Sequence, residues 1–180
     1  DNSIPLITTP YMQAFRLSCL CEAGEVECVR ESLRDYFGNM ASTGTSTFWE
    51  TYKIGEQKES ATDMYGRPFG RSQCHIWGAG AILIIGKYFY GLKNDTAFGE
   101  RFVLQPYLPA IENTSATLPL KHGKITVSYY GNTFSVRAEE QSGELRLNGV
   151  SHELTAGKTY TFDTKQKAAF SASVPQTKAI

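Results

Sequence analysis

The amino-acid sequence predicts an α+β protein, with helices in the first part of the chain and antiparallel β-strands in the second. Three observations predict this class. Apolar residues recur at a helical period up to about residue 93, they alternate with a period of two from Asn94 onward, and turn residues separate the alternating segments. Because helices and strands do not interleave, we expect two domains: helices over 1–93 and a β-sandwich over 94–180.

The first helix is expected to begin at Thr9-Pro10, since Thr is a favoured N-cap residue and Pro is favoured at the first helical position. Gly24 is a suitable residue to follow its C-terminus. Between these ends, one face of the helix carries five residues at helical spacing: Tyr11, Ala14, Phe15, Ser18 and Cys19.

A second helix is expected to begin directly afterwards, with Glu25 in its first turn and Gly38 or Gly44 at its end. Two helices joined by a short Ala-Gly turn form an antiparallel αα-hairpin. The apolar stripe of this second helix consists of Val26, Val29, Leu33, Phe37 and Met40.

A third helix is expected over 72–90, with Ser72 as its N-cap residue. Three glycines lie inside it, Gly78, Gly80 and Gly86, and each costs about 1 kcal/mol relative to Ala in a helix. We therefore expect a neighbouring helix to approach this inner helix closely.

From residue 94 onward, short alternating segments predict an antiparallel sandwich. His122 and His152 are both assigned to turns between strands, and no strand is assigned after Phe162, where the alternation is lost. The predicted strands are Phe102–Leu104, Leu118–Lys121, Ile125–Tyr129, Phe134–Arg137, Glu144–Leu147 and Thr159–Phe162.

The composition argues against several classes of function. Hydrophobic residues make up 41% of the chain, which suits a globular protein with a core. Lys and Arg number 18, as do Asp and Glu, so the sequence offers no surplus of positive charge for nucleic acid. The longest apolar stretch, 79–85, is far shorter than the roughly 20 residues that span a bilayer, so no membrane insertion is expected.

Four cysteines lack the spacing of zinc ligands: Cys19, Cys21, Cys28 and Cys74. We interpret them as small, buried, reduced residues, and expect no metal ion or other cofactor. The chain opens on Asp1 without a visible secretion signal, and three helices are too few to close a helical domain. We therefore expect it to be a segment of a longer protein.

The residues best suited to chemistry lie in and just after a polar, aperiodic segment over 41–71, a length typical of functional loops. This segment contains Gly-Thr-Ser-Thr-Phe-Trp-Glu, which ends at Glu50, and the next helix opens with Ser-Gln-Cys-His-Ile-Trp over 72–77. Aromatic residues beside a carboxylate suit sugar recognition, because pyranose rings stack on Trp and their hydroxyls need carboxylate and imidazole partners.

The residues alone leave several alternatives open. Glu50 beside Trp49 suits general acid–base chemistry, but a solvated loop carboxylate or a helix-capping group has the same sequence signature. His75 suits a hydrogen bond to a sugar, or to a nearby loop. Trp77 favours a core position more strongly than Trp49, for which core and sugar-binding positions are equally compatible with the sequence.

The run from 44 to 50, followed by Ser-Gln-Cys-His-Ile-Trp-Gly-Ala-Gly over 72–80, resembles the C-terminal part of the bacterial α-L-rhamnosidases of glycoside hydrolase family 78. Phe-Val-Leu-Gln-Pro-Tyr-Leu over 102–108 and Gly-Lys-Ile-Thr-Val over 123–127 extend the resemblance, which covers about 11–162. It implies the last helices of an α/α six-hairpin toroid followed by an antiparallel β-sandwich.

The resemblance also implies roles for three residues. Glu50 corresponds to the general base that activates water in these inverting enzymes, His75 to a histidine that hydrogen-bonds the sugar, and Trp49 to an aromatic wall of the subsite. The general acid, roughly 6.5–9.5 Å from the base in inverting enzymes, would lie upstream of this chain. After Trp-Glu the sequence departs from the family by reading Thr-Tyr-Lys-Ile over 51–54, which leaves the glycan open.

Three hypotheses of function follow: a fragment of an inverting α-L-rhamnosidase, another six-hairpin glycosidase or phosphorylase, and a non-catalytic carbohydrate-binding module. The candidate residues gather over 48–77, not on one face of the strands, which favours an enzyme. Expected partners are a carbohydrate substrate and the remainder of the parent catalytic domain. We also expect self-association through uncovered helix faces, an inactive isolated chain, and a secreted or periplasmic parent protein by resemblance.

Overall fold

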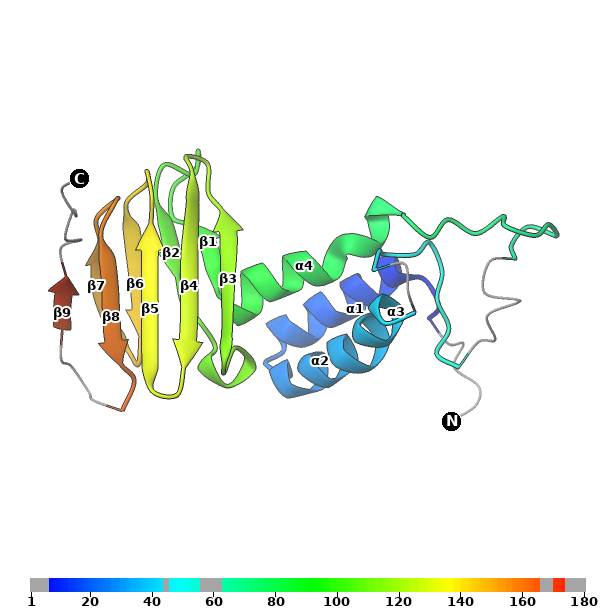
Figure 1. Ribbon diagram of the computed structural model, residues 1–180, viewed down its shortest axis with the longest axis horizontal. Coiled ribbons are helices and arrows are strands. Elements are labelled where there is room, and N and C mark those ends of the chain that lie inside the picture. The colour runs from blue at the N-terminus through cyan, green and yellow to red at the C-terminus, as the bar shows by residue number, and fades with distance from the viewer. Residues whose placement is uncertain (1–6, 44–45, 56–62, 166–169, 174–180) are drawn as a thin grey trace, which may run out of the picture. The chain divides into compact units, whose positions relative to one another are not determined.

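The computed structural model describes residues 7–43, 46–55, 63–165 and 170–173. The chain divides into two compact units, Asp1–Ile84 and Ile85–Ile180. The first unit is helical, and the second contains the strands (Figure 1). The expected α+β class, with helices before strands, is confirmed.

Helix α1 (Pro10–Glu22) begins where the sequence predicts it. Thr9 has extended backbone angles and is followed by Pro at N1, while Gly24 takes a left-handed φ of 85° just after the helix. Tyr11 and Phe15, from the face predicted to be apolar, are exposed in the structure. The buried residues of α1 are Pro10, Leu17 and Cys21.

The second predicted helix is present as one helical run with a π-helical middle. It consists of α2 (Val26–Ser32), the π-helix η1 (Leu33–Gly38) and α3 (Asn39–Ala41), and so ends between the two glycines proposed as its end. The predicted apolar stripe is confirmed as the packed face, since four of its residues are buried: Val29, Leu33, Phe37 and Met40.

The third helix begins four residues later than expected. A 3-10 turn, η2 (Ile76–Ala79), leads into α4 (Gly80–Ile84), and the second unit opens with the π-helix η3 (Ile85–Phe89). The prediction that Ser72 caps this helix is therefore wrong, and His75 occupies the N-cap position. The reason is that residues 72–75 use their backbone groups to bond the preceding loop instead of starting a helix.

The glycines of the third helix mark a close approach at two of three positions. A Cβ added to Gly80 would overlap the Cβ of Ala14 in α1. A Cβ added to Gly78 would lie 2.8 Å from Phe48 Cβ and 3.0 Å from the carbonyl oxygen of Trp49. The same test at Gly86 finds no atom within 4 Å. The expected close approach of a helix is therefore confirmed at Gly80, whereas the nearest neighbours of Gly78 belong to the loop and Gly86 has none.

The second unit contains two sheets. The four-stranded sheet has the order β1-β2-β6-β7, made of Leu92–Asn94, Phe102–Leu104, Gly143–Leu147 and Val150–Leu154. The five-stranded sheet has the order β3-β4-β5-β8-β9, made of Thr114–Pro119, Lys124–Tyr130, Thr133–Ala138, Thr159–Asp163 and Phe170–Ser173. A 3-10 turn, η4 (Leu108–Ala110), joins β2 to β3.

The strands differ from the prediction in three respects. β1, β7 and β9 were not predicted, and β3 begins and ends earlier than the expected segment. His152 lies inside β7 and not in a turn, whereas His122 does lie between two strands. β2 pairs with β6 in parallel, with Phe102 opposite Gly143, although the other strand pairs are antiparallel.

The two sheets share a core. Residues alternate between buried and exposed along β4 and β5, as expected for strands with one face on a core. The ring centroids of His152 in β7 and Phe162 in β8 lie 4.7 Å apart, and these strands belong to different sheets. Fully buried side chains of the two sheets include Phe102, Leu104, Leu145, Ile125, Val127 and Phe134. This arrangement agrees with the predicted sandwich.

Of the four cysteines, Cys21 is buried. The prediction of buried cysteines is therefore wrong for the three exposed thiols: Cys19, Cys28 and Cys74. Within the described residues, no group of three or more His, Cys, Asp or Glu side chains is placed to share a metal ion. In the same part of the chain, no helix has the length and apolar character needed to cross a bilayer.

Candidate functional site

Two loop segments of the helical unit are held together by backbone hydrogen bonds. The Glu50 N–H donates to the Ser72 carbonyl oxygen at 2.9 Å, and the His75 N–H donates to the Phe48 carbonyl oxygen at 2.7 Å. The hydroxyl of Thr47 also donates to the backbone of the second segment. The structure therefore places Glu50 and His75 on directly bonded segments, although 25 positions separate them in the numbering.

Among the described residues, each oxygen of the Glu50 carboxylate has one hydrogen-bond donor. The Tyr65 hydroxyl donates to Oε1 at 3.1 Å, and the Ser72 backbone N–H donates to Oε2 at 3.3 Å. The hydrogen bond to Glu50, followed by the negative charge of its carboxylate, raises the pKa of the Tyr65 hydroxyl. Because each carboxylate oxygen has two lone pairs, Glu50 can still accept a hydrogen bond from water or a sugar hydroxyl.

His75 is half-buried and has an extended backbone at the start of η2. Its ring lies edge-on to the indole of Trp77, with ring centroids 5.6 Å apart. Trp77 in turn contacts Tyr11 of α1, at 5.3 Å between centroids, and Tyr11 contacts Phe15 at 4.9 Å. We call these four residues the aromatic cluster; an imidazole placed among aromatic rings can bond a sugar hydroxyl while its neighbours cover the apolar ring face.

The two tryptophans occupy opposite environments. Trp49 is 4% exposed, packs edge-on against Tyr52 at 5.8 Å, and has its backbone N–H 3.4 Å from the sulfur of Met40. Trp77 is 63% exposed, which contradicts the expectation that it is the core tryptophan. An aromatic wall needs an exposed ring face, and in this structure Trp77 has one whereas the expected residue, Trp49, does not.

The loop that carries Glu50 is anchored to the helices by tyrosines. The Tyr52 N–H donates to the Thr8 carbonyl oxygen at 2.7 Å. The Tyr36 hydroxyl of η1 lies 2.9 Å from that same oxygen and 3.1 Å from the Tyr52 carbonyl oxygen. Burial raises the pKa of Tyr36 strongly, so its hydroxyl remains a donor at neutral pH.

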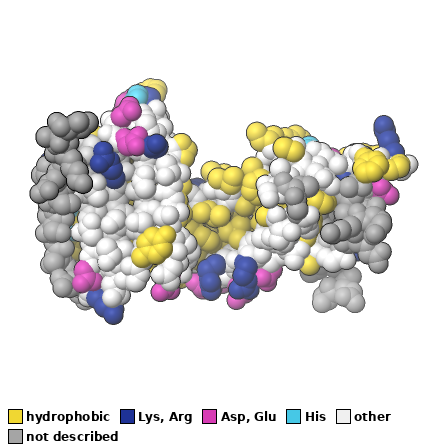
Figure 2. All heavy atoms as spheres, viewed as in Figure 1, with side chains coloured by type: hydrophobic (Ala, Val, Ile, Leu, Met, Phe, Trp, Pro, Cys, Tyr) yellow, Lys and Arg dark blue, Asp and Glu magenta, His cyan; other side chains and the backbone are white. Residues whose placement is uncertain are grey.

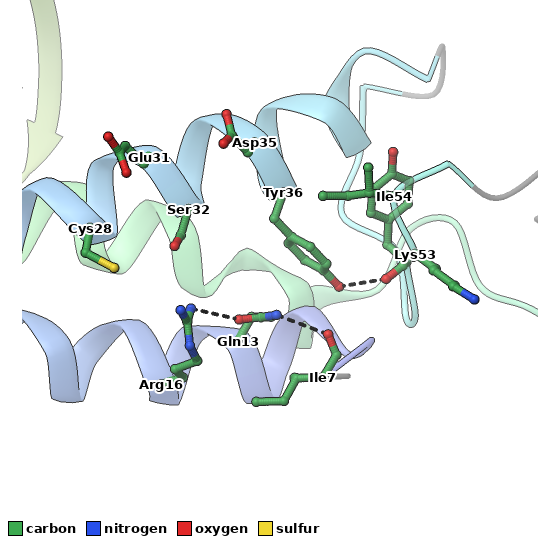
Figure 3. A pocket seen from close by; sticks show the side chains of 11 residues that line it. Ile7, Gln13, Arg16, Cys28, Glu31, Ser32, Asp35, Tyr36, Lys53 and Ile54 are labelled. Atoms are coloured by element: carbon green, nitrogen blue, oxygen red, sulfur yellow. Dashed lines mark hydrogen bonds between the residues drawn. The ribbon is translucent and has the colours of Figure 1, made fainter. Parts of the chain in front are cut away.

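A groove of about 620 Å³ lies between α1 and the α2–η1 run (Figure 3). The Gln13 side chain spans part of its floor, accepting from Arg16 at 3.3 Å and donating to the Ile7 carbonyl oxygen at 3.0 Å. Both positively and negatively charged side chains line the groove: Arg16, Lys53, Glu31 and Asp35. None of Glu50, Trp49 and His75 lines this groove.

Large apolar side chains are exposed on the helical unit. Figure 2 shows hydrophobic side chains gathered over the helices. The large hydrophobic residues exposed on α1, η2 and α4 are Tyr11, Met12, Phe15, Ile76, Trp77, Ile82 and Leu83. We call this set the exposed apolar surface; contiguous apolar surfaces on a soluble domain usually mark a contact with another element or molecule.

No protein-family model matches the sequence, and no curated protein matches it significantly. Among solved structures, the chain is similar to a GH78 family rhamnosidase of Bacillus sp. GL1, with a TM-score of 0.52 and 23% sequence identity. It shares its fold with part of that rhamnosidase. The match covers 72% of this chain and 13% of the rhamnosidase chain. At this identity the likeness concerns the fold, and it agrees with helices followed by a sandwich-like domain.

Tyr65 is the site residue that sequence reasoning missed. The segment 41–71 has no periodicity, so the sequence does not indicate that one of its side chains reaches Glu50. A signal was present in the pair Tyr65-Gly66, because Gly is favoured at the second position of a two-residue turn. The exposure of Trp77 was also missed, since a tryptophan in an apolar run is usually buried.

Proposed function

We propose that this chain is part of a glycoside hydrolase, an inverting α-L-rhamnosidase acting on rhamnose-containing glycans. The observation that carries the proposal is the pairing of the two loop segments. It brings a carboxylate with free lone pairs and an imidazole into the same region of the helical unit, beside an exposed tryptophan. Similarity of fold to part of a GH78 family rhamnosidase supports the same assignment.

In this proposal Glu50 is the general base. It accepts a proton from the water that attacks the anomeric carbon, on the face of the sugar opposite the leaving group. A second carboxyl group must protonate the leaving oxygen, and we propose that it comes from a part of the parent protein outside this chain. The isolated chain is therefore expected to lack useful hydrolytic activity.

His75 and the exposed tryptophan are proposed to bind the sugar. The imidazole of His75 bonds a sugar hydroxyl, and the exposed face of Trp77 stacks on the apolar face of the ring. The wall role expected for Trp49 would require its indole to become uncovered, so we propose Trp77 for this role instead.

We further propose that the remainder of a helical catalytic domain covers the exposed apolar surface. A six-hairpin toroid needs more helices than the described part of the first unit contains, and α1, η2 and α4 offer large uncovered side chains to such neighbours. A non-catalytic binding module is less well supported, because the aromatic cluster lies on the helical unit and not on the sandwich.

The test uses a protein that carries this chain together with the rest of its catalytic domain. On an aryl α-L-rhamnoside, Glu50→Gln keeps the side-chain shape but removes the base, so kcat should fall by roughly 10²–10⁴-fold with little change in KM. His75→Ala removes one hydrogen bond and should mainly raise KM, by about 10-fold. Asp63→Asn, on the same loop as Glu50, is the matched control and should leave both constants unchanged. Near-native turnover of Glu50→Gln would show that Glu50 is not the base.

A further inference from the structure

The segment before the Ser72–His75 stretch contains a tight turn closed by two backbone hydrogen bonds. The Met64 N–H donates to the Arg67 carbonyl oxygen and the Arg67 N–H donates to the Met64 carbonyl oxygen, each at 3.2 Å. The two residues between them, Tyr65 and Gly66, have left-handed φ angles of 55° and 72°. Two-residue turns of this kind favour Asn, Asp or Gly at both positions.

Tyrosine is an unusual residue at the first position of such a turn, because a bulky side chain at positive φ clashes with its own backbone. Burial does not explain its presence, since the Tyr65 side chain is 70% exposed. A strained residue that is not needed for packing points to a role for the side chain itself.

The side chain of Tyr65 reaches back 15 residues along the chain to Glu50, and its hydroxyl donates to Oε1 at 3.1 Å. The other oxygen, Oε2, accepts from the Ser72 backbone N–H at 3.3 Å. With one donor on each oxygen, both the position and the plane of the carboxylate are fixed. Without Tyr65, the described contacts hold Oε2 but not Oε1. The carboxylate could then rotate about its Cγ–Cδ bond.

We propose that Tyr65 is a positioning residue for Glu50, which holds the carboxylate of the general base in the orientation needed to bind the attacking water. This inference rests on the proposed function of Glu50. The role fits a phenol, since a carboxylate can only accept, and the Tyr65 hydroxyl, whose pKa is raised by Glu50, keeps its proton at neutral pH. A base that is fixed before the water binds contributes more to the rate than one that must be ordered in each turnover.

The hydrogen bond is tested first in the chain as it stands, by NMR titration of tyrosines labelled at Cζ. Tyr65→Phe assigns the Tyr65 signal. In Glu50→Gln the titration midpoint of Tyr65 should fall towards the value of about 10 found for a free tyrosine, because the negative acceptor is gone. Asp63→Asn, which removes a carboxylate from the same turn region, is the matched control and should leave the midpoint unchanged. An equal fall in both variants, or no fall in Glu50→Gln, would overturn the contact.

The positioning role is tested in the protein that contains the rest of the catalytic domain. Tyr65→Phe should lower kcat by roughly 10- to 100-fold while KM changes little. Asp63→Asn, a change at an exposed residue just before the same turn, should leave kcat unchanged and so controls for loop disruption. An unchanged kcat in Tyr65→Phe, with Glu50→Gln still strongly impaired, would overturn the positioning role but not the base. Full activity of Glu50→Gln, with the NMR shift present, would overturn the proposed function and leave the contact intact.

Discussion

At the scale of single residues, the two tryptophans of the chain differ sharply in how much of each side chain is exposed. Trp49 precedes the candidate base and is packed into the helical unit, whereas Trp77 follows the candidate histidine and is exposed. The sequence predicts the aromatic character of this region, but not which indole is exposed. The tertiary contacts of the Trp49 segment include a close approach to Gly78, where an added Cβ would lie 3.0 Å from the Trp49 carbonyl oxygen.

Fluorescence can test this assignment, because the chain has two tryptophans. In Trp49→Phe the remaining indole is Trp77, which should be quenched strongly by acrylamide and emit at a wavelength close to that of free tryptophan. In Trp77→Phe the remaining indole is Trp49, which should be quenched weakly and emit at shorter wavelength, since its side chain is buried. Equal quenching of the two variants would contradict the environments described above.

A second residue-level feature is the charge cluster on β6 and β7. The Glu144 carboxylate accepts from Arg146 Nε at 2.8 Å and from the Ser151 hydroxyl at 2.5 Å. The hydrogen bond from Arg146, followed by that from Ser151, lowers the pKa of Glu144 to about 2. A carboxyl group with a lowered pKa stabilises the fold above its unfolded pKa, and this contribution is lost as the pH falls through the folded value.

Glu144→Gln should therefore reduce the acid sensitivity of the sandwich unit. The difference in urea midpoint between wild type and variant is expected to be largest near neutral pH and to shrink between about pH 4.5 and about pH 2. Because the cluster lies at the surface, added salt should also reduce the difference. Glu112→Gln, which leaves Arg146 and Ser151 in place, serves as the control. A difference that is constant over this pH range would exclude the ion pair as its cause.

At the scale of elements, the packing of α1 against α4 depends on the absence of a side chain. A methyl group on Gly80 would overlap the Cβ of Ala14, so Gly80→Ala should destabilise the helical unit by about 1–3 kcal/mol. Ala14→Gly should restore part of that loss in the double variant, because it removes the overlapping atom. Gly38→Ala is the matched control: its Cβ would meet one atom, the Leu33 carbonyl oxygen, at 3.8 Å, and it should be neutral or stabilising. Urea unfolding of wild type and these three variants measures all of these effects.

Elements with a clear periodicity of apolar residues were predicted well. Elements whose existence or bounds depend on tertiary contacts were not. The stripe of α2 and η1 follows from spacing alone, as do the alternating strands β4 and β5. The start of the third helix was predicted too early because residues 72–75 bond the loop before them, which is a contact between distant positions. β7 was missed because its central residue is His152, and the packing of that ring on Phe162 is not visible in a sequence.

At the scale of the whole molecule, the parallel pairing of β2 with β6 is the feature least accessible from sequence. Hairpin signals predict antiparallel neighbours, and they are right for consecutive strands such as β3, β4 and β5. β2 and β6 are separated by three intervening strands, and no local signal fixes their direction. Gly143 takes part in this pairing, because a Cβ there would lie 2.7 Å from ring atoms of its partner Phe102.

The exposed apolar surface predicts self-association of the chain. Sedimentation velocity should show the average mass rising with concentration, because large exposed apolar surfaces tend to bind one another in water. Phe15→Ser, within this surface, should shift the distribution towards monomer. Phe98→Ser is the matched control, since Phe98 is equally apolar and 82% exposed but lies on the other unit. A chain that stays monomeric at all concentrations would contradict this prediction.

The hydrogen bonds between the Glu50 and Ser72 segments also have a consequence for the residues that lie between them in the chain. Because the Glu50 N–H and the Ser72 carbonyl oxygen are tied together at 2.9 Å, the ends of the intervening stretch are fixed whatever lies between them. Lengthening a loop whose ends are already held costs little, since the closure entropy grows slowly with length. Changes in length within this stretch are therefore expected to leave the backbone positions of Glu50 and His75 where they are, as long as Tyr52 and the turn Met64–Arg67, which presents Tyr65 to Glu50, are kept.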